Sequence, residues 1–259
     1  MQQTSTWYNN RENGPFQNFL EKSWETSPTM SVLTLIHFGM IFVCLLGLAL
    51  DGRTLMGEPV WIKPLKFAIS GGIYCATITW LMTYVTRAKW LGKIIMWGNG
   101  FLIFGEVAII TIQAARGLRS HYNVSNPLDG ALWGAMGTMI GIMWALNLML
   151  IFLLLFQPFK DAAFKSALVL GVIIAFLGGL TGFYMTGQLT AEQTALQEQG
   201  EPLEFAGAHS IGGEDGGAGL PFVGWSTTHG DMRPVHFVGL HGLQTVSYTH
   251  LTLPTILLV

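Results

Sequence analysis

The sequence predicts an all-α protein, a bundle of transmembrane helices with six visible spans, and three observations lead to this prediction. Of the 259 residues, 51% are hydrophobic and only 11% are charged, against roughly 25% charged residues in soluble domains. The mean hydropathy is +0.46. Several segments of about 20 residues are almost uniformly apolar, which is the length that crosses a bilayer core at about 1.5 Å per residue.

Composition also excludes some classes of function. The net charge of −2 and the pI near 6.4 offer no basic surface for nucleic acid. The two cysteines, Cys44 and Cys75, each lie in an apolar run, so neither a disulfide framework nor a redox pair is expected. The partner that the composition predicts is the lipid bilayer, and no nucleic acid is expected.

The N-terminal segment, residues 1–29, is polar and lacks the regions that define a signal peptide. One helical face within it gathers the apolar side chains Phe16, Phe19, Leu20 and Trp24. This pattern predicts a short helix that lies on the membrane surface. The first span, which follows directly, is then expected to act as its own insertion signal.

The transmembrane bundle is predicted over residues 30–245. Its spans cover approximately residues 30–50, 65–85, 94–115, 131–156 and 167–186, and a sixth has Pro234 near its first turn. Pro64 suits the first turn of the second span, because proline fits there without losing a hydrogen bond. Residues 187–233 interrupt the pattern as an acidic, glycine-rich loop whose single basic residue is Arg233.

The last stretch, residues 246–259, resembles the in-frame translation of a sequencing adapter. It interrupts the sixth span with the polar residues SYTH and a proline. We therefore expect this tail to be non-native and the natural chain to continue beyond it, so that the bundle is C-terminally truncated. Deleting the tail is expected not to reduce folding further.

The third span contains the most informative pattern. Asn99, Glu106 and Gln113 recur every seven residues, so they lie on one face of the helix. An ionisable residue at the depth of Glu106 costs a few kcal/mol or more unless it is paired, protonated or facing a polar cavity. The stripe is therefore either polar glue between helices or a functional site inside the membrane.

The orientation of the bundle rests on a weak charge difference. Lys and Arg residues are almost equally divided between the two sides, and the count favours a cytoplasmic N-terminus once Lys63 and Lys66 are assigned to the base of the second span. The acidic loop is then outside. In this orientation the polar chemistry gathers in the middle and outer half of the membrane, at Gln113, Arg116, Arg119, His121, Asp129, His229, Asp231, Arg233 and His236.

Three segments of the sequence indicate where in the cell the protein is located. The stretches QAARGLRSHYN (113–123), GDMRPVHFVGLHGLQ (230–244) and WIKPLKFAIS resemble segments of uncharacterised multi-pass proteins of bacterial inner membranes. The resemblance covers about a third of the chain and implies the cell inner membrane. It implies no named activity.

The first functional hypothesis is a haem- or metal-binding, redox-type membrane protein. His37 and His241 are expected at similar depths, where they could ligate haem iron from opposite faces. Alternatively, Glu106, His236 and His241 could hold a divalent metal ion. His236 and His241 are five residues apart and point in different directions from one regular helix, so a site formed by that helix alone is not expected. A quinone-type or other small molecule is the partner that such chemistry suggests.

Three alternatives are open. In a proton-coupled small-solute transporter, Glu106 changes protonation, and Arg116 or His241 stabilises its charged form. In an intramembrane zinc hydrolase, Ser120, His121, Asp129 and His236 act at the outer face. These residue types are similar to those of the ceramidase and progestin-receptor-like superfamily, although the HxxxH pair of that superfamily is absent here. In the third alternative, the polar residues only pack helices together.

Overall fold

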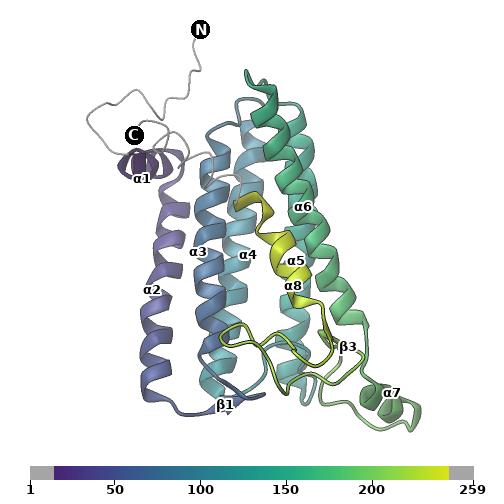
Figure 1. Ribbon diagram of the computed structural model, residues 1–259. Helices are drawn as coiled ribbons and strands as arrows, with labels where there is room; N and C mark the ends of the chain where they lie inside the picture. Colours follow the sequence, from purple (N-terminus) through teal and green to yellow (C-terminus); the bar gives the residue numbers. More distant parts are fainter. Residues whose placement is uncertain (1–14, 245–259) are drawn as a thin grey trace.

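The computed structural model describes residues 15–244, and helices dominate this part of the chain (Figure 1). The helices are α1 (Pro15–Thr26), α2 (Pro28–Leu50), α3 (Ile62–Met82), α4 (Lys89–Arg116), α5 (Pro127–Leu155), α6 (Ala162–Gly187), α7 (Ala191–Glu198) and α8 (Arg233–Leu240). Two antiparallel pairs of short strands join β1 (Thr54–Leu55) to β2 (Glu58–Pro59) and β3 (Ser210–Ile211) to β4 (Gly230–Asp231). The prediction of a non-native tail at 246–259 lies outside the described residues.

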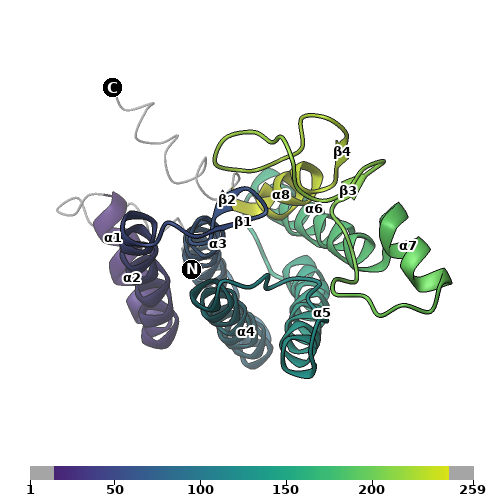
Figure 2. The ribbon, with the colours of Figure 1, turned by 90° about the horizontal axis from the view of Figure 1, so that it is seen from below.

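Within residues 15–244, five helices are long and apolar enough to cross a membrane, namely α2 to α6. The predicted multi-pass helical architecture is confirmed at this level. The predicted sixth span is not confirmed, because its described part contains only the eight residues of α8. Consecutive long helices pack against one another, and α8 packs against α6. Seen from below, α8 lies beside α6 on the side of α3 (Figure 2).

The two ends of the bundle carry different connecting segments (Figure 1). The N-terminal end carries α1 and the turns at 83–88 and 156–161. The opposite end, called the loop end here, carries the β1–β2 hairpin, the turn at 117–126 and the segment 188–232. The long acidic loop and the 83–88 turn thus lie at opposite ends, as the predicted order of spans requires.

Helix α1 occupies the place predicted for a surface helix and runs across the end of α2 (Figure 1). Its apolar side chains divide between two environments. Phe16, Leu20 and Trp24 are exposed, whereas Phe19 packs against the core. An exposed apolar stripe beside a membrane-spanning helix suits the lipid interface.

Local sequence signals explain where the long helices start and stop. Ser27 precedes Pro28 and accepts a hydrogen bond from the Met30 amide (3.3 Å). In the same way Asn126 precedes α5 and accepts from the Asp129 amide (3.0 Å). Such side chains satisfy amides that have no partner inside the helix. Helix α4 ends at Arg116 and is followed by the capping residue Gly117, whose positive φ of 74° suits glycine.

The apolar core lies toward the N-terminal end. Trp80, Leu81, Ile95, Leu150 and Leu154 are all fully buried there. Buried polar side chains occur at both ends, and those nearer the loop end belong to the C-terminal half of α4, the turn after it and the start of α5, namely Glu106, Gln113, Ser120, Asn123 and Asp129. Within the described residues, the two buried carboxylates, Glu106 and Asp129, lie in the half of the bundle nearer the loop end.

Two glycines hold α8 against α6. A Cβ atom added to Gly178 would lie 2.7 Å from the Gly239 Cα, and one added to Gly239 would lie 2.6 Å from the Gly178 Cα. The two backbones therefore touch, which is the contact that small residues permit between membrane helices. His236 strengthens the contact, because its Nδ1 donates to the Gly178 carbonyl (2.9 Å).

Replacing Gly178 with alanine is expected to detach α8 from α6, because the clash is with backbone that cannot rotate away. Overpacking of this kind typically costs about 1–3 kcal/mol. Hydrogen exchange should show faster exchange of the α8 amides. The matched control is Gly137→Ala on α5, where an added Cβ meets nothing within 4 Å. Equal α8 exchange in both variants would contradict the proposed contact.

Candidate functional site

The polar stripe on α4 faces the other helices. Asn99 and Gln113 are each 0% exposed, and Glu106 is 2% exposed. The seven-residue spacing therefore predicted the buried face correctly. The three side chains differ, however, in the partners that they meet there.

Asn99 links helices by hydrogen bonds. Its Nδ2 donates to the Ile95 carbonyl (2.8 Å). The Tyr74 hydroxyl on α3 lies 2.9 Å from the Asn99 Oδ1 and 3.1 Å from the Asn147 Oδ1 on α5. One hydroxyl thus joins three spans, and the amides of Asn99 and Asn147 have a packing role.

Gln113 also links two helices by hydrogen bonds. Its Nε2 donates to Asp129 Oδ1 on α5 (2.9 Å), while Arg116 donates to both Gln113 Oε1 and Asp129 Oδ1. Asn126 Nδ2 donates to the other oxygen of Asp129 (2.6 Å). Asp129 is therefore fully engaged, and Arg116, a predicted partner of Glu106, is committed to Asp129 instead.

Glu106 differs from both neighbours on the stripe. Its Oε1 is buried and has no hydrogen-bond partner among the described residues. The charge of Lys63 acts on it from α3, but the two groups form no ion pair. A buried carboxylate in a membrane helix without a partner is costly, so it is a functional candidate by default.

Lys63 is the second residue of α3 and is half-buried. Within residues 15–244 its ammonium group makes no hydrogen bond or ion pair. The cations around it each have a carboxylate of their own: Lys66 with Glu58 (3.5 Å), Arg119 with Asp215 (3.6 Å), and Arg233 with Asp231 (2.6 Å). Lys63 and Glu106 are therefore an amine and a carboxyl group that have no ion-pair partner among the described residues, and we call them the split pair.

His121 extends the site toward the loop end. It lies in the turn at 117–126, where its Nδ1 is 3.1 Å from the Ser120 hydroxyl and its ring packs edge-on against Phe67. Burial lowers its pKa well below the usual value, and the nearby charges of Lys63, His236, His209 and Arg119 lower it further. His121 is thus neutral at neutral pH.

Asp215 is one of the residues that hold the 188–232 segment in place. Its carboxylate accepts hydrogen bonds from the backbone amides of His209 (3.1 Å) and Ser210 (2.9 Å), and it lies 3.0 Å from the His209 ring Nδ1. Burial alone would raise the pKa of Asp215, but these contacts outweigh burial and lower it to about 2. Arg119 also stacks 4.1 Å above the Phe205 ring, which ties the loop to the 117–126 turn.

Acidification is expected to loosen this end of the protein. His121 has a lowered pKa when folded, so its contribution is complete above about pH 6.5 and falls as the pH drops, by up to about 1.4 kcal/mol per pH unit. Asp215 adds a second loss as the pH falls from about 4 toward 2. Unfolding measured between pH 8 and 5 should show a slope that His121→Asn reduces. A slope unchanged in His121→Asn would contradict a buried neutral histidine.

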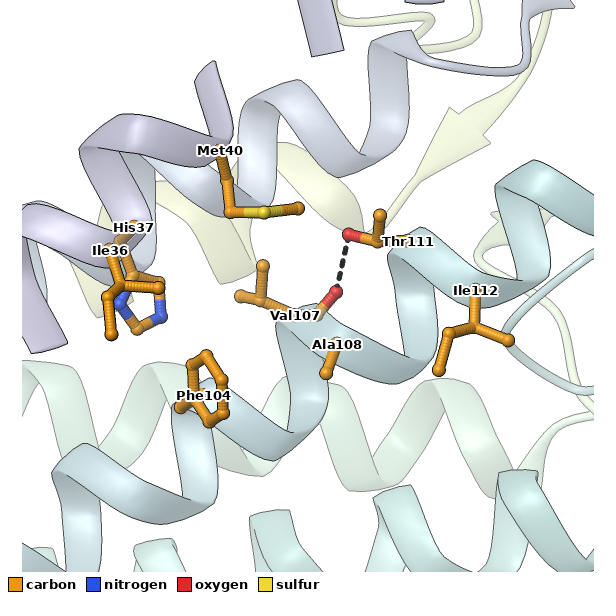
Figure 3. Close-up of a pocket in the computed structure, with 8 residues that line it drawn as sticks. All are labelled: Ile36, His37, Met40, Phe104, Val107, Ala108, Thr111 and Ile112. Atoms are coloured by element: carbon orange, nitrogen blue, oxygen red, sulfur yellow. Dashed lines mark hydrogen bonds between the residues drawn. The ribbon is translucent and has the colours of Figure 1, made fainter. Parts of the chain in front are cut away.

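His37 on α2 is 1% exposed. Its Nδ1 donates to the Leu33 carbonyl (2.8 Å), while Nε2 has no partner in the described chain. The ring packs against Gly71 of α3, where an added Cβ would be 2.6 Å from Cδ2. His37 also borders a cavity of about 220 Å³ between α2 and α4 (Figure 3).

That cavity does not favour a cofactor. Its walls are apolar, and the Thr111 hydroxyl is already bonded to the Val107 carbonyl (2.7 Å) (Figure 3). Ligand pockets typically measure about 300–1,000 Å³, so 220 Å³ is small for haem or for a quinone-type ligand.

His37 and His241 are not brought together. His37 touches α3 at Gly71, whereas His241 Nε2 lies 3.5 Å from the hydroxyl of Ser70. Helix α3 stands between α2 and α8 (Figure 2), so the two rings approach it from different sides. The predicted haem arrangement, in which both rings ligate one iron, does not match this geometry.

The metal and hydrolase arrangements are not assembled either. Within residues 15–244, no group of three or more His, Cys, Asp or Glu side chains could hold a metal ion. His236 is occupied with Gly178 and Thr181 on α6, and Asp129 with Arg116 and Gln113. Asp231 and Arg233 pair with each other beside β4 and fix the start of α8.

Sequence reasoning missed the effect of Lys63 on Glu106. The sequence places Lys63 at the membrane surface because it lies at the start of a span, where lysines extend toward water. Sequence reasoning also missed Tyr74, His209 and Asp215. A signal for Asp215 existed, since an aspartate beside glycines is a frequent loop anchor, but its partners are distant in the sequence.

Comparisons with known proteins give no match. No protein-family model, no curated protein and no solved structure matches the chain. The function is therefore argued from the split pair and its surroundings.

Proposed function

We propose that the protein is a proton-coupled membrane transporter of a small solute, in which Glu106 takes up and releases the proton. The observation that carries this proposal is the buried Glu106 carboxylate without a hydrogen-bond partner. Its neighbours Asn99 and Gln113 are satisfied by other helices, so helix packing explains them but leaves Glu106 unexplained. A group that must change its charge inside a membrane cannot be locked in a permanent ion pair.

The environment of Glu106 supports the same function. Lys63 is near enough to stabilise the charged carboxylate, yet it forms no bond that would prevent protonation. The charges of Lys63 and Arg119 also act on His121 in the turn at the loop end. This series of groups offers a route between Glu106 and the water at that end.

The membrane setting completes the proposal. We place the protein in a bacterial inner membrane with the N-terminal end in the cytoplasm, on the resemblance of segments 113–123 and 230–244 and on the distribution of Lys and Arg. In this setting α8 is the start of a sixth span. A redox protein with haem or a metal is less supported, because the candidate ligands are occupied or lie apart.

The test is solute-linked proton movement. The purified full-length chain is reconstituted into vesicles that contain a pH-sensitive dye, and amino acids, organic acids and amines are added in turn outside. Transport predicts that one class changes the internal pH in protein-containing vesicles and not in empty ones. No response to any of the three classes would contradict the proposal.

A further inference from the structure

We propose that a short zwitterionic solute completes the split pair, an amino acid whose carboxylate binds Lys63 and whose ammonium group binds Glu106. This inference deepens the proposed function and rests on it in taking Glu106 as part of the solute site. It starts from an amine and a carboxyl group that act on each other electrostatically, while neither forms a hydrogen bond or ion pair within the described residues.

The packing of α3 against α4 sets the distance between Lys63 and Glu106 along the bundle. An added Cβ on Gly71 would lie 3.5 Å from Val107, so residue 71 of α3 marks the level of Glu106. Lys63 comes eight residues earlier, which places its Cα about 12 Å closer to the loop end at 1.5 Å per residue. The two side chains interact electrostatically but form no ion pair. A bridge of a few heavy atoms suits such an arrangement.

Charge balance selects a zwitterion. Lys66, Arg119 and Arg233 each have a carboxylate partner, so Lys63 and Glu106 are left without one. A simple anion would satisfy Lys63 and leave Glu106 alone, and a simple cation would do the reverse. Because an uncompensated charge is costly in a low-dielectric interior, a solute with both charges is the best complement.

The surroundings also fix the direction of the solute. Lys63 is nearer the loop end, with Arg119, Arg233 and Lys66 around it, and the neutral His121 adds no competing charge. The carboxylate of the solute therefore points to the loop end, and its ammonium group points inward to Glu106. Since a protonated Glu106 has no negative charge to offer, proton and solute exclude each other, and binding should release a proton.

The test compares glycine with acetate and methylammonium, which each carry one of its two charges. Binding to the full-length chain in lipid nanodiscs is measured by calorimetry, together with proton release in weak buffer. Glycine should bind at least about tenfold more tightly than either single-charge probe, which corresponds to about 1.4 kcal/mol. Glycine is the smallest amino acid, so a steric side-chain limit cannot hide binding.

Lys63→Gln and Glu106→Gln should each weaken glycine binding at least about tenfold, and only Glu106→Gln should abolish proton release. Lys63→Arg keeps the charge and should retain binding. The matched control is Lys160→Gln, at the opposite end of the bundle. Circular dichroism and size-exclusion chromatography check that the variants fold.

Two results would overturn the inference. One is acetate binding as tightly as glycine, and the other is glycine binding that Lys63→Gln does not alter. If glycine fails to bind while Glu106 still titrates in the wild-type protein, the zwitterion is wrong and the proposed proton role stands. If Glu106 does not titrate either, both fail.

Discussion

Replacing Glu106 with glutamine is expected to abolish solute-linked proton movement and to leave the helix bundle folded. Glutamine keeps the shape and the hydrogen-bonding capacity of the side chain but cannot carry a proton. Because Glu106 makes no hydrogen bond in the described chain that the change would break, the unfolding free energy should change by less than about 1 kcal/mol. In the vesicle assay, the response should fall to that of empty vesicles.

The matched control is Glu198→Gln in α7, an exposed glutamate of the loop. This variant loses the same charge at the surface and should transport normally. Wild-type flux in Glu106→Gln would show that Glu106 is only a packing residue. A large loss of stability in that variant would show that the carboxylate has a structural partner.

Replacing Asp129 with alanine is expected to cause the largest loss of stability. Asp129 accepts hydrogen bonds from Gln113, Asn126 and Arg116, and its side chain is 0% exposed. Removing it leaves these donors unsatisfied, including a guanidinium that is 34% exposed and so partly compensated by water. We expect a cost of about 2–4 kcal/mol, measured by unfolding in mixed detergent micelles.

The control for Asp129 is Asp161→Ala. Asp161 is exposed and accepts one hydrogen bond from the Phe164 amide at the start of α6 (3.0 Å). Losing such a cap typically costs about 1 kcal/mol. If the two variants lost equal stability, the network around Asp129 would not join α4 to α5 as described.

Much of the fold could be predicted because membrane helices are determined by local properties. Apolar runs of sufficient length gave the five long helices. The pairs Ser27-Pro28 and Asn126-Pro127 mark two of their starts. The sixth span could not be established in the same way, since α8 is short within the described residues.

The face of a helix could be predicted, but the partners of its side chains could not. Seven-residue spacing put Asn99, Glu106 and Gln113 on one buried face, because that spacing depends only on helix geometry. Partners depend on where other helices lie. Arg116 binds Asp129 and not Glu106, because the start of α5 lies beside the end of α4.

The depth of a residue along its span was also not enough to predict whether His37 and His241 lie close together. His37 and His241 were expected near one iron because both lie near the middle of their predicted spans. The structure separates them, since α3 stands between α2 and α8 (Figure 2). Depth does not say on which side of a neighbouring helix a ring lies.

The most direct test of the central claim is infrared difference spectroscopy of the full-length protein in lipid nanodiscs, recorded between acidic and alkaline pH. If Glu106 exchanges a proton inside the membrane, the wild-type spectrum contains a carboxylic acid band that disappears in Glu106→Gln and persists in Glu198→Gln. Identical spectra for the wild type and Glu106→Gln would contradict the claim.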